Sequence, residues 1–317
     1  MSPATASPST ASPATAYRRT RRRWGAPALF LLPAALLFVA FLAIPICYAL
    51  YLSFRGMRVS GGGPFGVREE TWVGLDNYVT AFTDPEFLAG FGRLAIYGII
   101  AVPVTLGLAL TFALLLDLPR VRGARFSRTA IFVPYAVPGV VATLLWGFLY
   151  LPSTSPGTWI LERLGLGGLD VLHGGMLYPS VANIAIWSGV GFNMIILYTS
   201  LRGIPGDVYE AARLDGASEW DIAWRVKVPL VGPALVLTGL FALIGTLQVY
   251  GEPTTLRPMT SAISQTWVPL MTIYRDAFTR DDLSLAAASS VALALGTLVV
   301  SVVLLRVTQK RSFGESS

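Results

Sequence analysis

The chain has 317 residues, of which 54% are apolar and only 13% are charged, and its formal net charge is +6. Charged residues make up about a quarter of an ordinary soluble domain, so this composition excludes that class and predicts a chain that lies mostly in a lipid bilayer. A nucleic-acid-binding role is excluded too, because no soluble fold is available to present a basic patch.

The first 24 residues differ in composition from the rest of the chain. Residues 1–16 alternate Ser, Pro, Ala and Thr, and five arginines follow between Arg18 and Arg23. Such a segment has too little apolar surface to pack, so we expect residues 1–24 to be a disordered basic cytoplasmic tail. The arginines before an apolar run also suggest a cleaved export signal. However, the run that follows is longer than a signal sequence, which favours an uncleaved first membrane helix.

Residues 25–317 are expected to form one transmembrane domain. A helix of about 20 apolar residues crosses the hydrocarbon core, and the chain contains six stretches of roughly that length or longer: Ala26–Phe54, Leu94–Leu116, Ala130–Leu151, Val181–Leu201, Val231–Tyr250 and Leu285–Leu305. The sequence therefore predicts an all-α, multi-pass integral membrane protein with six transmembrane helices. The single cysteine, Cys47, lies in the first of them.

The positions of Lys and Arg predict the orientation of these helices. With the N-terminus inside, 16 of the 24 basic residues fall on inner segments and 8 on outer ones. Inner loops of membrane proteins carry the excess of basic residues. Both termini, and the polar segment between the fourth and fifth spans, are therefore predicted to be cytoplasmic.

The third span carries two prolines four residues apart, Pro134 and Pro138, with Tyr135 between them. Proline removes a backbone donor, and broken backbone at membrane depth is tolerated only where it is buried in protein or lines a wet cavity. Interrupted helices mark substrate sites in many transporters. The alternative is a kink that serves packing alone.

The polar segment between the fourth and fifth spans predicts two short helices hinged at a glycine. Asp207 is expected to cap the first helix, with Glu210 three residues later, and Gly216 to end it in a left-handed conformation. Ser218 is expected to cap the second helix, and Pro229 to mark its end.

This segment carries the pattern Glu210-Ala211-Ala212, two free residues, then Asp215-Gly216-Ala217. The pattern resembles the EAA loop of the permease subunits of bacterial ATP-binding-cassette importers. In that family the loop, here residues 202–229, is the coupling helix that docks into a groove of the ATPase. The resemblance implies a type I importer permease fold in the cell membrane. It also implies four kinds of partner: a second homologous permease, an ATPase dimer, an extracytoplasmic solute-binding protein and the lipid bilayer.

Within these importers, the chain is most similar to the first permease of carbohydrate systems of the maltose type. The similarity is carried by Leu31-Leu32-Pro33, by Val73-Gly74-Leu75-Asp76-Asn77-Tyr78 and by Phe132-Val133-Pro134-Tyr135. One departure follows the fifth span, where the family has Thr-x-Gly-Gly-Pro and this chain has Tyr250-Gly251-Glu252-Pro253. That departure weakens the assignment of a particular substrate.

The resemblance also implies a path for the substrate. Ser188 and Phe192 share a face of the fourth span, and Gly245 and Gln248 share one on the fifth. Such stripes are more often packing seams, but these positions match ones that line the sugar cavity in the maltose-type permease. Gln248 stands where an amide is expected, whereas Gly139 and Gly245 replace polar residues. The residues expected to line the path are Tyr135, Gly139, Ser188, Gly189, Phe192, Gly245 and Gln248.

Several kinds of chemistry are missing from the sequence. None of the six predicted spans contains Asp, Glu, Lys, Arg or His, although carriers driven by ion gradients often depend on such groups. No phosphate-binding loop is present, and His173 is the only histidine, so neither a catalytic set nor a metal site is expected. We expect a non-enzymatic permease without cofactors, with ATP bound by a partner subunit. The alternatives are a stand-alone secondary transporter or channel, or a membrane scaffold.

The predicted orientation is testable by cysteine labelling in intact cells. In a variant that lacks Cys47, a cysteine at Ser218 should be protected from an impermeant thiol reagent, because the charge distribution places the loop inside. A cysteine at Thr154 should be labelled. Labelling of both from outside would contradict the six-span arrangement.

Overall fold

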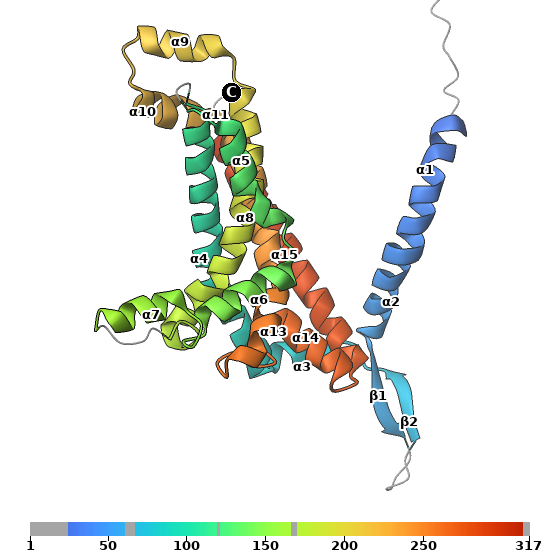
Figure 1. The fold of residues 1–317 in the computed structure, drawn as a ribbon. Helices are drawn as coiled ribbons and strands as arrows, with labels where there is room; N and C mark the ends of the chain where they lie inside the picture. The colour runs from blue at the N-terminus through green and yellow to red at the C-terminus, as the bar shows by residue number, and fades with distance from the viewer. Residues whose placement is uncertain (1–24, 61–66, 119–120, 166–169, 313–317) are drawn as a thin grey trace, which may run out of the picture. The chain divides into compact units, whose positions relative to one another are not determined.

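The computed structural model describes residues 25–60, 67–118, 121–165 and 170–312 of the chain (Figure 1). It divides into two compact units, residues 1–48 and 49–317, which are described separately. The predicted tail at 1–24 lies outside the described residues. Helices dominate both units, as the composition predicts, and the two strands of the described part form one small hairpin.

The described part of the first unit is helical. It comprises α1 (Gly25–Phe38), a π-helical stretch η1 (Val39–Ala43) and most of α2 (Ile44–Leu52). The helical run Leu29–Leu52 has a mean hydropathy of 2.7 and is long enough to cross a bilayer. This run is the first predicted span.

The second unit begins with a β-hairpin. Strand β1 (Arg55–Ser60) pairs antiparallel with β2 (Val67–Trp72), with Arg55 opposite Trp72. Helix α3 (Asp76–Thr83) follows, and the side-chain amide of its Asn77 donates to the carbonyl oxygens of Ser53 at 2.9 Å and Arg55 at 2.7 Å. These bonds fix the base of the hairpin.

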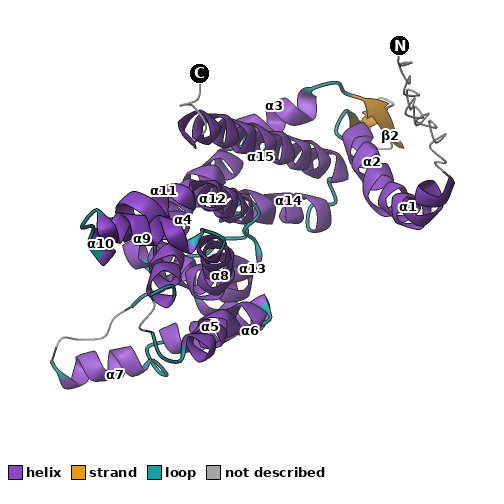
Figure 2. Cartoon of the chain, turned by 90° about the horizontal axis from the view of Figure 1, so that it is seen from above, coloured by secondary structure: helices purple, strands orange, loops and turns teal. Residues whose placement is uncertain are grey.

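The core of the second unit is built on two long helices, α4 (Pro85–Leu116) and α8 (Leu177–Arg202), which pack along each other. Small residues of α4, Ala109 and Ala113, are fully buried in one cluster with Met194 and Leu197 of α8. Small side chains let two helix backbones approach closely. Helix α12 (Gly232–Leu247) packs against both, and α15 (Leu283–Ser312) packs on α12 and α14 (Pro269–Phe278). Figure 2 shows this group seen from above.

The third predicted span is broken at its prolines, as expected. It comprises α5 (Ala124–Phe132), a 3₁₀ turn η2 (Val133–Ala136) and α6 (Gly139–Tyr150), and the path bends by 95°. Helix α5 lies against α8 at Gly191. A Cβ at that glycine would stand 2.2 Å from the carbonyl oxygen of Ile131, so only glycine permits this contact.

The fifth predicted span, Val231–Tyr250, corresponds to α12 and is preceded by a bend at Val231. The helical run Glu219–Leu230 meets α12 at an angle of 66°. Within the described residues, four helices are long and apolar enough to cross a membrane, and the number rises to six if each bent pair is one span. The prediction of six spans agrees with the upper figure.

The remaining elements lie in two places. Segments α9 (Gly206–Leu214), α10 (Glu219–Asp221), η4 (Ile222–Lys227) and α11 (Val228–Leu230) stand at one end of α4 and α8. The others stand toward the opposite end (Figure 1); they are α7 (Pro156–Arg163), η3 (Gly174–Met176), α13 (Gly251–Leu256) and η5 (Arg257–Met259).

The close approach at Gly191 gives a stability test. Gly191→Val should lower the thermal stability of the purified protein in detergent, because its Cβ would collide with the backbone of α5; overpacking costs about 1–3 kcal/mol. Gly296→Ala is the matched control, since a Cβ there meets no atom within 4 Å. Equal unfolding temperatures for both variants would contradict the contact.

Candidate functional site

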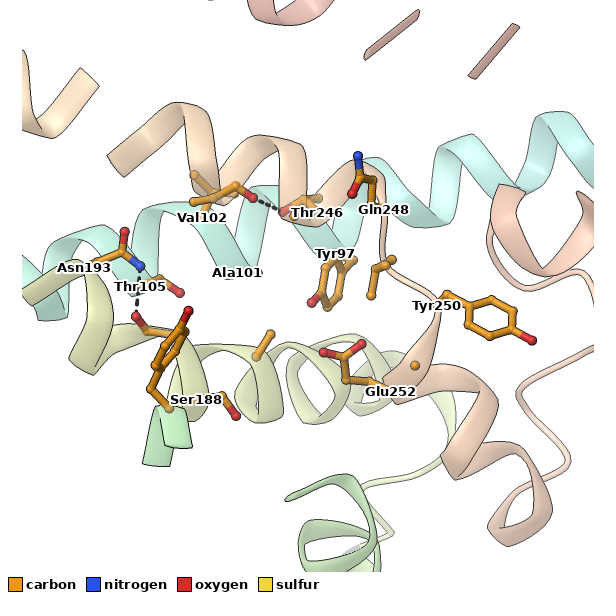
Figure 3. Close-up of a pocket in the computed structure, with 17 residues that line it drawn as sticks. Tyr97, Ala101, Val102, Thr105, Ser188, Asn193, Thr246, Gln248, Tyr250 and Glu252 are labelled. Carbon is orange, nitrogen blue, oxygen red and sulfur yellow. Dashed lines mark hydrogen bonds between the residues drawn. The ribbon is translucent and has the colours of Figure 1, made fainter. Parts of the chain in front are cut away.

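A cavity of about 320 Å³ opens between α4, α8 and α12 (Figure 3). Two irregular segments complete its wall. One is the 3₁₀ turn η2, which supplies Tyr135, and the other is the non-helical link from Gln248 to Tyr250 together with the start of α13. The cavity therefore lies where these two irregular segments meet α4 and α8. Its volume is within the range of small-molecule sites.

Five of the seven residues predicted for the substrate path line this cavity: Tyr135, Ser188, Gly189, Gly245 and Gln248. Phe192 is not among the lining residues, but its ring stacks on that of Tyr135, with centroids 4.8 Å apart and planes 17° from parallel. Gly139 does not line it either. It begins α6, and a Cβ there would meet no atom within 4 Å.

Several polar residues that the sequence analysis did not single out also face the cavity. They are Tyr97 and Thr105 of α4, Asn193 of α8 and Thr246 of α12. The side-chain nitrogen Nδ2 of Asn193 donates to the carbonyl of Gly189 at 2.9 Å, and its oxygen Oδ1 has no partner among the described residues. Thr246 donates to the Ala242 carbonyl.

Glu252 adds the only acidic side chain among the described residues that line the cavity, and no Lys, Arg or His accompanies it. It lies in the first turn of α13 and is half-buried. Figure 3 shows its carboxylate and the Tyr97 ring on facing sides of the same space. The sequence contained a signal for Glu252. The segment Tyr250-Gly251-Glu252-Pro253 departs from the family pattern, and an acid stands there in place of a small residue.

The second group of predicted residues lies on α9 and the turn after it. Helix α9 begins at Gly206, with Pro205 as its N-cap and no side-chain cap. The prediction that Asp207 caps this helix is therefore wrong. Pro205 already has the non-helical backbone of a cap, with φ −58° and ψ 139°, so the helix starts directly after it. Asp207 falls inside the first turn, where the helix dipole favours an acid.

Gly216 has φ +82°, as predicted, and ends α9. The amide of Ala217 donates to the carbonyl of Ala212, and that of Gly216 to Arg213, both at 3.0 Å. These two bonds define a Schellman turn, which pairs the last carbonyls of the helix. The turn leaves Glu210, Ala211, Asp215 and Gly216 exposed, whereas Ala212 and Ala217 are half-buried.

Ser218 caps the next helix, as predicted. Its hydroxyl accepts from the amide of Asp221 at 3.2 Å, and the Asp221 carboxylate accepts from the amide of Ser218 at 3.3 Å. The hydrogen bond from the Ser218 hydroxyl holds the pKa of Asp221 below its ordinary value. The prediction was that Pro229 marks the end of this helix. The helical path instead continues through Pro229 to Leu230 and turns at Val231. A proline near the start of a short helix costs no hydrogen bond.

His173 pairs with an acid in the loop that precedes η3. Its Nδ1 lies 2.8 Å from Asp170 Oδ2, and this contact lowers the pKa of Asp170. Among the described residues, no group of three or more His, Cys, Asp and Glu side chains is placed to hold a metal ion.

Comparison with known proteins relates the chain to membrane components of transport systems. Residues 106–311 match the family model described as binding-protein-dependent transport system inner membrane component. The osmoprotective compounds uptake permease protein GgtC of Synechocystis is 34% identical over 231 residues, which are 70% of this chain and 78% of the relative. The sn-glycerol-3-phosphate transport system permease protein UgpA of Escherichia coli is 31% identical over 295 residues, 92% of this chain and 96% of the relative.

The fold is also that of solved structures. A chain of a bacterial ABC transporter involved in the import of the acidic polysaccharide alginate superposes with a TM-score of 0.76 at 21% identity, covering 90% of this chain and 95% of the other. A second structure is that of a bacterial alginate ABC transporter in complex with an alginate pentasaccharide-bound periplasmic protein. It superposes with a TM-score of 0.78 at 20% identity, covering 90% of this chain and 94% of the other.

The Schellman turn gives a test of the loop geometry. Gly216→Val should raise hydrogen exchange of the amides at 216 and 217, because a β-branched residue held at positive φ costs about 1–3 kcal/mol. Gly216→Asn is the control, since asparagine tolerates this conformation. Exchange that is unchanged in the valine variant would contradict the left-handed turn.

Proposed function

Because the chain belongs to the family of binding-protein-dependent transport system inner membrane components, we propose that it is the first-permease subunit of an ATP-binding-cassette importer for a neutral sugar or oligosaccharide. In this proposal it assembles in the cell membrane with a second, homologous permease, an ATPase dimer and an extracytoplasmic solute-binding protein. The chain itself performs no chemistry, and ATP is bound by the partner subunit.

One observation carries the proposal of a solute path: two irregular backbone segments, the 3₁₀ turn η2 and the link from Gln248 to Tyr250, border the same cavity. The Tyr135 ring, stacked on Phe192, offers an apolar face of the kind on which sugar rings pack. The amides of Gln248 and Asn193 and the hydroxyl of Ser188 offer hydrogen bonds to solute hydroxyls. An apolar wall with a few convergent polar groups is typical of a small-molecule site.

Charge at the cavity favours a neutral solute. One relative is named for an anionic solute, glycerol 3-phosphate, and one structure of the same fold is described as importing the acidic polysaccharide alginate. An anion that enters this cavity would lose hydration and meet the Glu252 carboxylate, with no cationic side chain from the described lining residues to offset the cost. A carboxylate that accepts two hydroxyl hydrogen bonds suits a polyhydroxylated solute instead.

The segment α9–α11 supplies a surface for the ATPase. Beside the exposed Glu210, three large apolar side chains face outward: Leu214 is 88% exposed, Trp220 72% and Trp224 47%. Exposed apolar patches of this kind mark protein interfaces. In the proposed mechanism ATP closes the ATPase dimer, this coupling segment moves with it, and the two permeases change from inward-open to outward-open. Bound ATP drives that change only by favouring one state over the other.

The rival function is a secondary transporter or channel that works alone. It gives the exposed surface of the coupling segment no role. Vesicle uptake separates the two. Transport of a neutral disaccharide that requires the added ATPase, the binding protein and ATP supports the importer. Transport driven by an ion gradient without the ATPase refutes it.

The selectivity of the cavity is tested at Glu252. In vesicles with the complete importer, Glu252→Arg should reduce uptake of the neutral solute at least about tenfold, because it replaces an acceptor by a cation and costs more than one good hydrogen bond to a charged group. Glu252→Gln, which keeps the shape, should have the smaller effect. Arg58→Gln, on the distant hairpin, is the control. Full uptake with Glu252→Arg would show that Glu252 does not line the solute path.

A further inference from the structure

A buried ion pair stands between the end of α4 and the coupling segment. Lys227, the last residue of η4, donates from Nζ to Oδ2 of Asp117 at 2.6 Å, and Asp117 directly follows α4. Only 6% of the Lys227 side chain and 4% of the Asp117 side chain are exposed. The two residues are 110 positions apart in sequence, so the contact joins the first half of the chain to the loop.

Two further residues join α8 and α9 to the pair. The ammonium of Lys227 lies 5.0 Å from the centroid of the Tyr209 ring, on α9, where a cation is attracted to the ring face. Arg202, at the end of α8, places Nη1 3.8 Å from the second carboxylate oxygen of Asp117. Burial, and next the Asp117 carboxylate, raise the pKa of Tyr209, with Arg202 opposing.

The pair limits how the loop can move. Separating two buried opposite charges leaves each without its partner in a poorly solvated place, which is strongly unfavourable. A displacement of η4 and α9 therefore takes the end of α4 with it. Helix α4 runs without a break from Pro85 to Leu116 and supplies Tyr97 and Thr105 to the cavity.

We propose that the Asp117–Lys227 pair, with Tyr209 above the ammonium, is the mechanical link that transmits movement of the coupling segment to α4 and hence to the cavity. This rests on the proposed importer function. The exposed pair Arg213–Glu219 in the same loop does not have this role. Its side chains are 43% and 51% exposed, and solvent-exposed pairs contribute little.

The test uses the complete importer in proteoliposomes, with its second permease and ATPase. The readout is the ratio of ATP hydrolysis with the solute-binding protein added to hydrolysis without it. Asp117→Asn and Lys227→Met should each lower this ratio at least about fivefold, the lower end of typical coupling between sites. The exchanged pair, Asp117→Lys with Lys227→Asp, should restore at least half of it.

A second double variant distinguishes a role of the pair in coupling from a role in packing alone. Asp117→Leu with Lys227→Met replaces the pair by apolar side chains, which often keeps or raises stability. It should assemble, yet the ratio should stay low, because apolar groups slide past one another at little cost. Arg58→Gln, which breaks the exposed Arg58–Asp76 pair, is the control and should keep the full ratio.

The outcomes are distinct. A full ratio in the apolar double variant, or no recovery in an assembled exchanged pair, overturns the proposal. If single variants fail to assemble, the comparison of the two double variants decides it. A wild-type complex that the binding protein does not stimulate refutes the proposed importer function instead.

Discussion

The requirement that every backbone polar group be paired in hydrocarbon organises this chain. Irregular backbone at membrane depth is stable only where protein or water covers it. In the described part of the second unit, the 3₁₀ turn Val133–Ala136 and the non-helical link between Leu247 and Gly251 both border one cavity. The unbroken helices α4 and α8 complete the wall. Polar side chains from the long helices and from both irregular segments thus face the site, and the packing of the long helices holds it in place.

Charged side chains occupy two functional places in the second unit. The ion pair of Asp117 and Lys227 lies beyond the end of α4, beside the coupling segment, and Glu252 lies at the cavity. Between them the helices present hydroxyls, amides and aromatic rings. In our proposals, the ion pair holds the coupling segment to α4, and Glu252 disfavours anions in the cavity.

Local features were predictable from the sequence because their causes are local. Pro134 and Pro138 predict the break, the left-handed residue at Gly216 follows from its helix-ending position, and the cap at Ser218 follows from its hydroxyl. The prediction that Asp207 caps the helix was wrong because Pro205, two residues earlier, is the N-cap. Long-range features were not predictable. Asn193 and Thr105 face the cavity only because α4 and α8 pack in one register, and no pattern pairs Asp117 with Lys227 across 110 residues.

The central claim is that the cavity bordered by η2 and by the link from Gln248 to Tyr250 is the solute path, and Gly245 tests it most directly. A Cβ at Gly245 meets no atom within 4 Å, although the residue lines the cavity, so Gly245→Leu fills the path without disturbing the packing. Gly107→Leu, at an exposed position of α4 outside the cavity, is the matched control. The account predicts that vesicles with the complete importer lose uptake of a neutral disaccharide with Gly245→Leu and keep it with Gly107→Leu, while both complexes assemble. Full uptake with Gly245→Leu would contradict it.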